Sequence, residues 1–237
     1  MKKILNINPI TSKEFNIMSQ DYLDSIKSKN TEVISISIER GPASIEAFYD
    51  EAYALPEILN IVDEYKSKVD AIMLNCFADP ALYAARELAN IPIVGPGETC
   101  IYTALMLGNK FAAISTRENS GPWVEIQARQ YGVEDRLVAS IGIDISVLEL
   151  GSDLEKTAEC LIEEANILIQ QKGAEVIVLG CTGMATVINL VQRKLSVPVI
   201  EPMAATFKMA EMLCSLDLKH SKACLYMYPD RGKITGY

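Results

Sequence analysis

The chain has 237 residues, of which 49% are hydrophobic and 22% charged, and this composition excludes a disordered, collagen-like or low-complexity chain. The length allows one large domain or two lobes of roughly 100 residues each. The formal net charge of −9 gives no electrostatic basis for binding nucleic acid or an anionic membrane surface. We therefore expect small molecules or proteins as partners, with no nucleic acid and no membrane.

Short runs of β-branched and other apolar residues alternate with helical patterns along the chain. This alternation is typical of a parallel sheet with crossover helices, so the sequence predicts an α/β fold. In chain order, the predicted strands cover residues 3–7, 32–38, 71–74, 91–94, 110–114, 137–141, 176–179, 197–200 and 223–227. The predicted helices cover residues 44–66, 80–89, 120–131, 154–171 and 204–214, and we expect Pro56 to kink the first of them.

The two halves of the chain resemble each other. The aligned pairs are residues 69–76 with 174–181, 92–96 with 198–202, and 3–8 with 111–116. This repeat predicts two similar lobes with parallel sheets flanked by helices, related by pseudo-two-fold symmetry, with the active site in the cleft between them. We place lobe 1 at residues 1–97, completed by residues 206–237, and lobe 2 at residues 98–205.

The repeat puts Cys76 and Cys181 at equivalent positions, just after a buried strand and before a helix. In open α/β sheets, ligands bind at the carboxyl ends of the strands, so the two thiols should face each other across the cleft. Backbone N–H groups and a helix amino terminus at each turn favour the thiolate, which predicts thiols that act as bases near neutral pH. We expect the other four cysteines to be ordinary core residues: Cys100, Cys160, Cys214 and Cys224.

Several other site chemistries are excluded by the sequence. No CxxC pair suggests zinc, an iron–sulfur cluster or a redox disulfide. The single histidine, His220, lies in a polar stretch and is expected to be a solvated loop residue, which argues against a Ser-His-Asp triad or a Cys-His dyad. Asn6, Asn8 and Pro9 interrupt the apolar amino terminus before it could serve as a signal peptide, so we expect a cytoplasmic protein with reduced thiols.

Two facing thiols without a metal, a pyridoxal lysine motif or a dinucleotide signature suit proton transfer at carbon. One thiol removes a proton from one face of the carbon and the other delivers a proton to the opposite face, which is racemisation. Negative charge then develops on a carbonyl or carboxylate oxygen. Backbone N–H groups of the two turns would hold that oxygen.

With these motifs the chain resembles the aspartate/glutamate racemase superfamily and, within it, the hydantoin racemase family that includes allantoin racemases. The resemblance covers nearly the full length and rests on residues 7–9 (INP), 41–46 (GPASIE), 76–80 (CFADP), 84–88 (AAREL) and 178–185 (VLGCTGMA). It implies a two-lobed racemase fold, a homo-oligomer, no cofactor and a two-cysteine mechanism acting on 5-substituted hydantoins or allantoin. By position, it implies that Cys76 and Cys181 are the catalytic pair.

We place five substrate-binding residues around the cleft: Asn8, Ser44, Phe77, Thr116 and Thr182. Asn8 and Thr116 end equivalent strands, and Phe77 can form a wall for a ring. Asn8 also suits a turn before a proline, and Ser44 a helix cap. Asp79 suits the cap of the helix that follows it. We predict no metal ligand and no cofactor-binding residue.

Three alternatives remain open. The first is racemisation of a free amino acid such as aspartate or glutamate, although those relatives typically continue the cysteine motifs as Cys-Asn-Thr and Cys-Thr-Glu or Cys-Thr-His, where this chain has Cys76-Phe77 and Cys181-Thr182-Gly183. The second is a malonate-type decarboxylase on the same fold, which would need only one proton-donating cysteine. The third is a non-catalytic, periplasmic-type pair of binding lobes, against which the paired cysteines argue.

Overall fold

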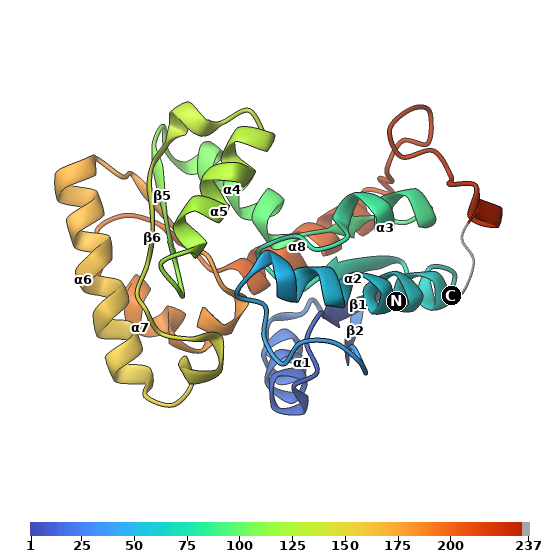
Figure 1. The fold of residues 1–237 in the computed structure, drawn as a ribbon, viewed down its shortest axis with the longest axis horizontal. Coiled ribbons are helices and arrows are strands. Elements are labelled where there is room, and N and C mark those ends of the chain that lie inside the picture. The colour runs from blue at the N-terminus through green and yellow to red at the C-terminus, as the bar shows by residue number, and fades with distance from the viewer. Residues whose placement is uncertain (234–237) are drawn as a thin grey trace.

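The computed structural model describes residues 1–233, and two four-stranded parallel sheets form its framework. The first sheet has the order β2-β1-β3-β4, from β1 (Lys2–Asn8), β2 (Thr31–Ser37), β3 (Ala71–Leu74) and β4 (Ile93–Val94). The second has the order β6-β5-β7-β8, from β5 (Phe111–Ser115), β6 (Leu137–Gly142), β7 (Val176–Leu179) and β8 (Val199–Ile200). The shared strand order confirms the predicted pair of similar α/β lobes, which stand side by side in Figure 1.

Helices cover both faces of each sheet, as expected for parallel strands joined by crossovers. The first sheet carries α2 (Phe48–Tyr65) and α3 (Leu82–Leu88) on one face, and α1 (Lys13–Ile26) and α8 (Pro202–Ser215) on the other. The second sheet carries α6 (Leu154–Lys172) and α7 (Ile188–Gln192) on one face, and α4 (Pro96–Leu107) and α5 (Ser120–Gln130) on the other. Short 3-10 turns are η1 (Glu134–Arg136), η2 (Val147–Glu149), η3 (Thr182–Val187) and η4 (Arg231–Lys233).

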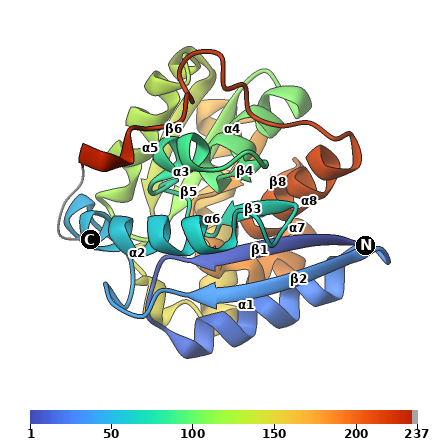
Figure 2. The same ribbon diagram turned by 90° about the vertical axis from the view of Figure 1, so that its right-hand side faces the viewer.

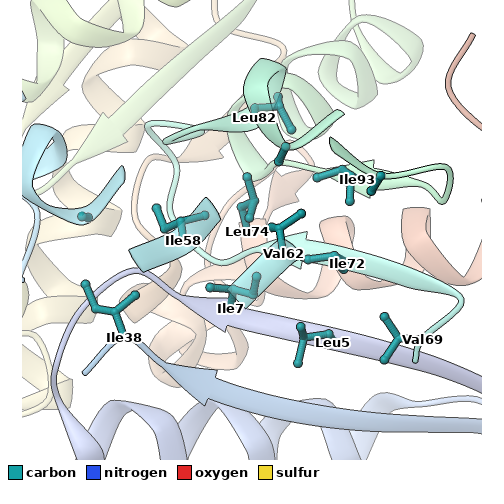
Figure 3. Packing of buried hydrophobic residues seen from close by; sticks show 13 residues of the cluster. Leu5, Ile7, Ile38, Ile58, Val62, Val69, Ile72, Leu74, Leu82 and Ile93 are labelled. Carbon is teal, nitrogen blue, oxygen red and sulfur yellow. The ribbon is translucent and has the colours of Figure 1, made fainter. Parts of the chain in front are cut away.

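The strand β1 shows how the sequence builds these layers. Successive side chains of a strand point to opposite faces, so Leu5 and Ile7 enter the cluster under α2 and α3, whereas Ile4 enters the cluster under α1 and α8. Figure 3 shows the first cluster, to which α2 contributes Ile58 and Val62. Asn6 and Asn8 of β1 lie on the α1 side, where both hydrogen-bond to Ser19.

Helix α8 returns to the first sheet after the second sheet is complete. It follows the second sheet in sequence but packs on β1, β3 and β4 of the first sheet, and it also packs against α4 where the two halves meet. This placement agrees with a first lobe completed by carboxyl-terminal residues. The division of the chain at residues 97 and 205 stays a prediction. Within residues 1–233, no helix combines the length and apolar character needed to cross a membrane.

The segment after α8 differs from the expected strand. Residues 223–227 form turns rather than a strand, so the prediction of a ninth strand is wrong. Side chains fasten the segment instead: Arg231 binds both carboxylate oxygens of Asp63 at 2.9 Å, and Lys222 donates to the Glu87 carbonyl at 3.1 Å. Figure 2 shows this segment, in red, running back across the molecule from α8.

His220 also differs from expectation. Its ring is half-buried, and Nε2 lies 2.8 Å from the backbone N of Ile93. Burial, together with the nearby positive charge of Arg86, lowers the pKa of His220 to about 4. The neutral ring therefore accepts a hydrogen bond at the edge of β4, and the expectation of a solvated residue is wrong.

The starts of two helices depart from the sequence prediction, and one further helix was not predicted. Helix α2 begins at Phe48 rather than at residue 44 and continues through Pro56. Helix α3 begins at Leu82 rather than at residue 80, because Asp79 and Ala81 adopt left-handed backbone conformations with φ of 55° and 60°. Helix α1 was not among the predicted helices, although Ser12 marks its start by accepting a hydrogen bond from the Phe15 N–H at 3.1 Å.

Candidate active site

One pocket lies where the carboxyl ends of the two sheets meet. Strand ends of the first sheet contribute Pro9, Ile10 and residues 75–78, and those of the second contribute Ser115, Thr116 and residues 180–182. The remaining lining comes from flanking segments of both halves: Phe15, Ile45, Ser120, Trp123, Val124, Gln127 and Val147. Cys76 and Cys181 therefore border the same space, one from each sheet.

The loop that carries Cys76 leaves β3 in a tight, hydrogen-bonded path. The Asp79 N–H donates to the Cys76 carbonyl at 3.0 Å, and the Ala78 N–H donates to the Cys76 sulfur. Gln127 of α5 donates from Nε2 to the Phe77 carbonyl at 2.8 Å. The position of the first thiol thus depends on groups from both halves of the molecule.

Cys181 lies at the start of the 3-10 turn η3. The backbone N–H groups of Gly183 and Met184 donate to its sulfur, and the Met184 N–H also reaches the Cys181 carbonyl at 3.1 Å. A Cβ atom on Gly183 would lie 3.0 Å from Leu150 and 3.5 Å from the Cys181 sulfur, so the glycine permits the close turn. These N–H groups form the expected nest of backbone donors beside the second thiol.

The acidity of the two thiols differs from the sequence prediction. Desolvation raises the pKa of Cys181 to about 11, against the opposing effect of the Gly183 and Met184 N–H groups. Desolvation raises the pKa of Cys76 still further, and a charge on Cys181 adds to that rise. The shifts favour the neutral form of both thiols near pH 7, against the expectation of thiolates at this pH. Both cysteines are partly exposed, but desolvation of the thiols outweighs the backbone donors.

The predicted binding residues fall into two groups. Phe77, Thr116 and Thr182 line the pocket together with the two cysteines, and the Thr182 hydroxyl donates to the Asn75 carbonyl across the two halves at 3.2 Å. Asn8 and Ser44 are not among its lining residues within the described chain. The Ser44 hydroxyl lies 3.5 Å from Glu46 and does not cap α2, whose N-cap is Ala47.

Asn8 is buried behind the pocket and orients a residue that sequence reasoning missed. Its Nδ2 donates to Asn16 Oδ1 at 2.8 Å and to Ser19 Oγ at 3.0 Å, so its Oδ1 is left to accept from Asn75 Nδ2 at 2.8 Å. These hydrogen bonds fix the orientation of the Asn75 amide. Asn75 lines the pocket, and its buried Oδ1 has no hydrogen-bond partner among residues 1–233. The only sequence signal was its place directly before Cys76.

The pocket lining is electrically neutral. Within residues 1–233, none of the lining side chains is a carboxylic acid, a lysine, an arginine or a histidine. Trp123 lines the pocket and lies against Phe48 with ring centroids 4.5 Å apart. In the same part of the chain, no group of three or more His, Cys, Asp or Glu side chains is arranged to hold a metal ion.

Cys224 departs from the expectation for the four remaining cysteines. Cys100 and Cys214 are buried and Cys160 is partly buried, but Cys224 is exposed on the carboxyl-terminal segment. The prediction of four core cysteines is therefore wrong for Cys224. None of these four lines the pocket described above.

Comparison with known proteins shows the family to which the chain belongs. The family model described as Asp/Glu/Hydantoin racemase matches residues 4–210. The chain belongs to this family. A hydantoin racemase of Rhizobium meliloti is 34% identical over 98% of this chain and 96% of its own length, and one of Pseudomonas sp. (strain NS671) is 32% identical over 99% and 94%.

The solved structures give the same result for the fold. Allantoin racemase from Klebsiella pneumoniae superposes with a TM-score of 0.93 at 32% identity, covering 100% of this chain and 97% of its own. The Asp/Glu/hydantoin racemase fold therefore extends over the whole chain. The protein is an isomerase of the racemase class.

Proposed function

We propose that this enzyme racemises a neutral cyclic ureide, a 5-substituted hydantoin or allantoin, with Cys76 and Cys181 as the two proton-transfer groups and without a cofactor. The observation that carries the proposal is one pocket bordered by both thiols and by no charged side chain within the described residues. Similarity to curated hydantoin racemases and to an allantoin racemase structure supports the same substrate class.

The neutral lining bears on the choice of substrate. A free aspartate or glutamate carries an ammonium group and two carboxylates, and burying such ions without partners costs several kcal/mol each. A substituted malonate brings two carboxylates into the same space. A hydantoin ring carries only neutral amide groups, so it needs no charged partner in the lining. The proposal therefore favours a cyclic ureide over both alternatives.

The proton steps follow from the unequal thiols. Cys181 ionises before Cys76, so the reactive form has one thiolate and one thiol. The thiolate takes the proton from the substituted ring carbon, and the electron pair moves onto the adjacent carbonyl oxygen. Backbone N–H groups beside the sulfur atoms stabilise that oxygen. The thiol then gives its proton to the opposite face of the carbon. The product is the other enantiomer, with the charges of the two sulfur atoms exchanged.

A substrate panel tests the proposal. The purified enzyme, dialysed against a chelator, is incubated separately with L-5-isopropylhydantoin, one enantiomer of allantoin, L-aspartate, L-glutamate and methylphenylmalonate, and the products are separated by chiral chromatography. We expect inversion of a cyclic ureide and none of the amino acids. Cys224→Ser is the matched control, since this thiol is exposed and lies outside the pocket. Activity on aspartate or glutamate alone would overturn the substrate class.

Two further features belong to the same proposal. We place the enzyme in the cytoplasm and expect it to act as a homo-oligomer. Size-exclusion chromatography with light scattering measures the oligomeric state directly.

A further inference from the structure

Two buried carboxylates occupy equivalent places at the helices where the halves meet. Helices α4 and α8 pack against each other, and each begins with a proline: Pro96 and Pro202. Each has its first N–H groups capped by a carboxylate, and each carboxylate also accepts a hydrogen bond from a tyrosine hydroxyl. The chemistry at the two sites is alike, but the carboxylates come from different positions in the repeat.

At α8 the cap is local. Glu201 directly precedes Pro202 and accepts from the N–H groups of Met203 and Ala204, both at 2.7 Å. The Tyr22 hydroxyl of α1 donates to the same carboxylate at 3.0 Å. Glu201 is 5% exposed. This arrangement stabilises the start of α8 and adds no bond to the turn that carries Cys181.

At α4 the cap comes from the loop that carries Cys76. The residue equivalent to Glu201 is Gly95, and a Cβ atom there would lie 2.2 Å from Asp79 Oδ1. The glycine thus leaves room for the Asp79 carboxylate, which accepts from the N–H groups of Gly97 at 2.9 Å and Glu98 at 2.7 Å. Asp79 therefore caps α4, not α3 as its sequence position suggested.

A tyrosine completes the second arrangement. The Tyr131 hydroxyl, just after α5, donates to Asp79 Oδ2 at 2.9 Å. Helices α4 and α5 both pack on the second sheet, whereas Asp79 follows β3 of the first. The Cys76 loop is thus tied to the opposite half of the molecule. By the offset of the repeat, Met184 stands where Asp79 would be in the Cys181 turn, and it carries no carboxylate.

We propose that Asp79 and Tyr131 are positioning residues for Cys76 alone, holding its loop at the distance from the second half that proton transfer requires. The inference rests on the proposed function for its catalytic consequence. Tyr131 does not line the pocket that holds the thiols, so it acts through Asp79 rather than on the substrate.

Electrostatics point in the same direction. The charge of Glu98 raises the pKa of Asp79, and the charge of Asp79 in turn raises the pKa of Cys76. Burial raises the pKa of Asp79 to about 7, while the hydrogen bond from Tyr131 lowers it. Loss of that hydroxyl favours protonated Asp79, which removes a negative charge near Cys76, and it loosens the loop. Both changes make Cys76 more reactive towards a small alkylating agent.

Iodoacetamide alkylation, followed for each cysteine by peptide mass spectrometry, tests the inference without any substrate. Tyr131→Phe keeps the ring and removes only the hydroxyl, and Tyr22→Phe is its matched control at Glu201. We expect Tyr131→Phe to speed alkylation of Cys76 about tenfold, in line with loss of a hydrogen bond to a charged group, and that of Cys181 less than about twofold. Tyr22→Phe leaves the Cys76 rate within about twofold. A purely structural role would also raise the rate of buried Cys214, which lies in α8, away from Asp79.

Deuterium exchange gives the catalytic readout. With the enantiomers of 5-isopropylhydantoin in deuterated water, Cys181→Ser identifies the enantiomer whose exchange depends on Cys76. Tyr131→Phe should slow exchange of that enantiomer about tenfold and of the other less than about twofold. Asp79→Asn, which keeps the side-chain shape, should act in the same direction. Equal effects on both cysteines, or none on either, would overturn the inference. If the serine variants themselves fail to separate the enantiomers, the two-cysteine proposal fails, and the alkylation result still decides the positioning role.

Discussion

Cys76 and Cys181 share a neutral pocket, and their difference in acidity matters more than the acidity of either alone. A charge on Cys181 raises the pKa of Cys76, so ionisation of the second thiol is hindered once the first has lost its proton. The pair therefore offers one base and one acid, as inversion at carbon requires. When substrate displaces water from the pocket, one thiol stays protonated, because a second charge in a dry site is costly.

Serine substitution should separate the two faces of the reaction. A serine hydroxyl is far less acidic than a thiol, so Cys76→Ser removes the base on one face and leaves Cys181 to exchange the proton of one enantiomer. Cys181→Ser should do the same for the other enantiomer. Deuterium incorporation measured by NMR, set against inversion measured by polarimetry, checks this. Loss of exchange with both enantiomers in both folded variants would contradict one thiol for each face.

The raised pKa of Cys181 predicts a steep pH dependence of its alkylation. The thiolate is the reactive form, and it becomes abundant only as the pH approaches about 11. The rate with iodoacetamide should rise about tenfold per pH unit between roughly pH 8 and pH 10, with Cys181 ahead of Cys76. Exposed Cys224 serves as the internal reference in the same digest. A plateau near pH 7 would show that the thiol is activated in the free enzyme.

For individual residues, the sequence predicted the two cysteines and their chain neighbours better than the side chains that pack around them. The repeat located Cys76 and Cys181, and their neighbours Phe77 and Thr182 followed from adjacency. Asn75 and Gln127 were missed because their roles depend on which side chains the fold brings opposite them. The pKa direction was also missed, since sequence reveals the backbone donors near a thiol but not how much water is excluded around it.

Helix α4 depends for its N-terminal cap on Asp79, which lies outside the helix in the loop after β3. The backbone at Gly95 is ordinary extended chain, with φ of −120°, so a side chain there meets only a steric obstacle, the Asp79 carboxylate. Gly95→Ala should displace Asp79 and lower the free energy of unfolding by about 2–4 kcal/mol, the sum of a lost cap and overpacking. Gly151→Ala is the control, as no atom lies within 4 Å of its added Cβ. Urea denaturation measures both, and equal stabilities would contradict the steric argument.

Element boundaries show where local patterns were insufficient. The apolar alternation of residues 223–227 suggested a strand, but no long strand edge is offered to it, since β4 spans only Ile93–Val94. The start of α3 was misplaced because the left-handed backbone at Asp79 and Ala81 arises from long-range contacts of Asp79. By contrast, the strands in the interiors of both sheets were predicted within a residue or two, because buried strands carry their own apolar signature.

The stability of the whole molecule should depend on pH through three groups whose pKa values are shifted by burial: Asp79, Glu201 and His220. Burial raises the pKa values of Asp79 and Glu201 to about 7, above their ordinary values. The folded state therefore binds more protons than the unfolded state between about pH 4 and pH 7, and their contribution to stability falls as the pH rises through that range. His220, with its pKa lowered to about 4, binds fewer protons when folded and acts in the opposite sense up to about pH 6.5.

The slope of the free energy of unfolding against pH should have opposite signs in the wild type and in a variant without the two carboxyl groups. The wild-type free energy of unfolding should fall from about pH 4.5 to pH 6.5, because two carboxyl groups outweigh one imidazole. In the double variant Asp79→Asn, Glu201→Gln only His220 remains of the three, so stability should rise over the same range. Urea titrations at several pH values measure both slopes. Parallel slopes in the two proteins would mean that these carboxyl groups are ionised throughout.

The return of α8 to the first sheet also has a consequence for how the protein is made. The face of that sheet bearing Ile4 and Met73 is covered by Phe207 and its neighbours on α8, which begins at Pro202. Helix α1 covers part of this face early, but a ribosome must add more than 200 residues before α8 completes the cover. The second sheet needs only helices from residues 96–192, which emerge earlier. On the nascent chain, the half that is begun first is the half that is finished last, and its open face is where a chaperone would bind.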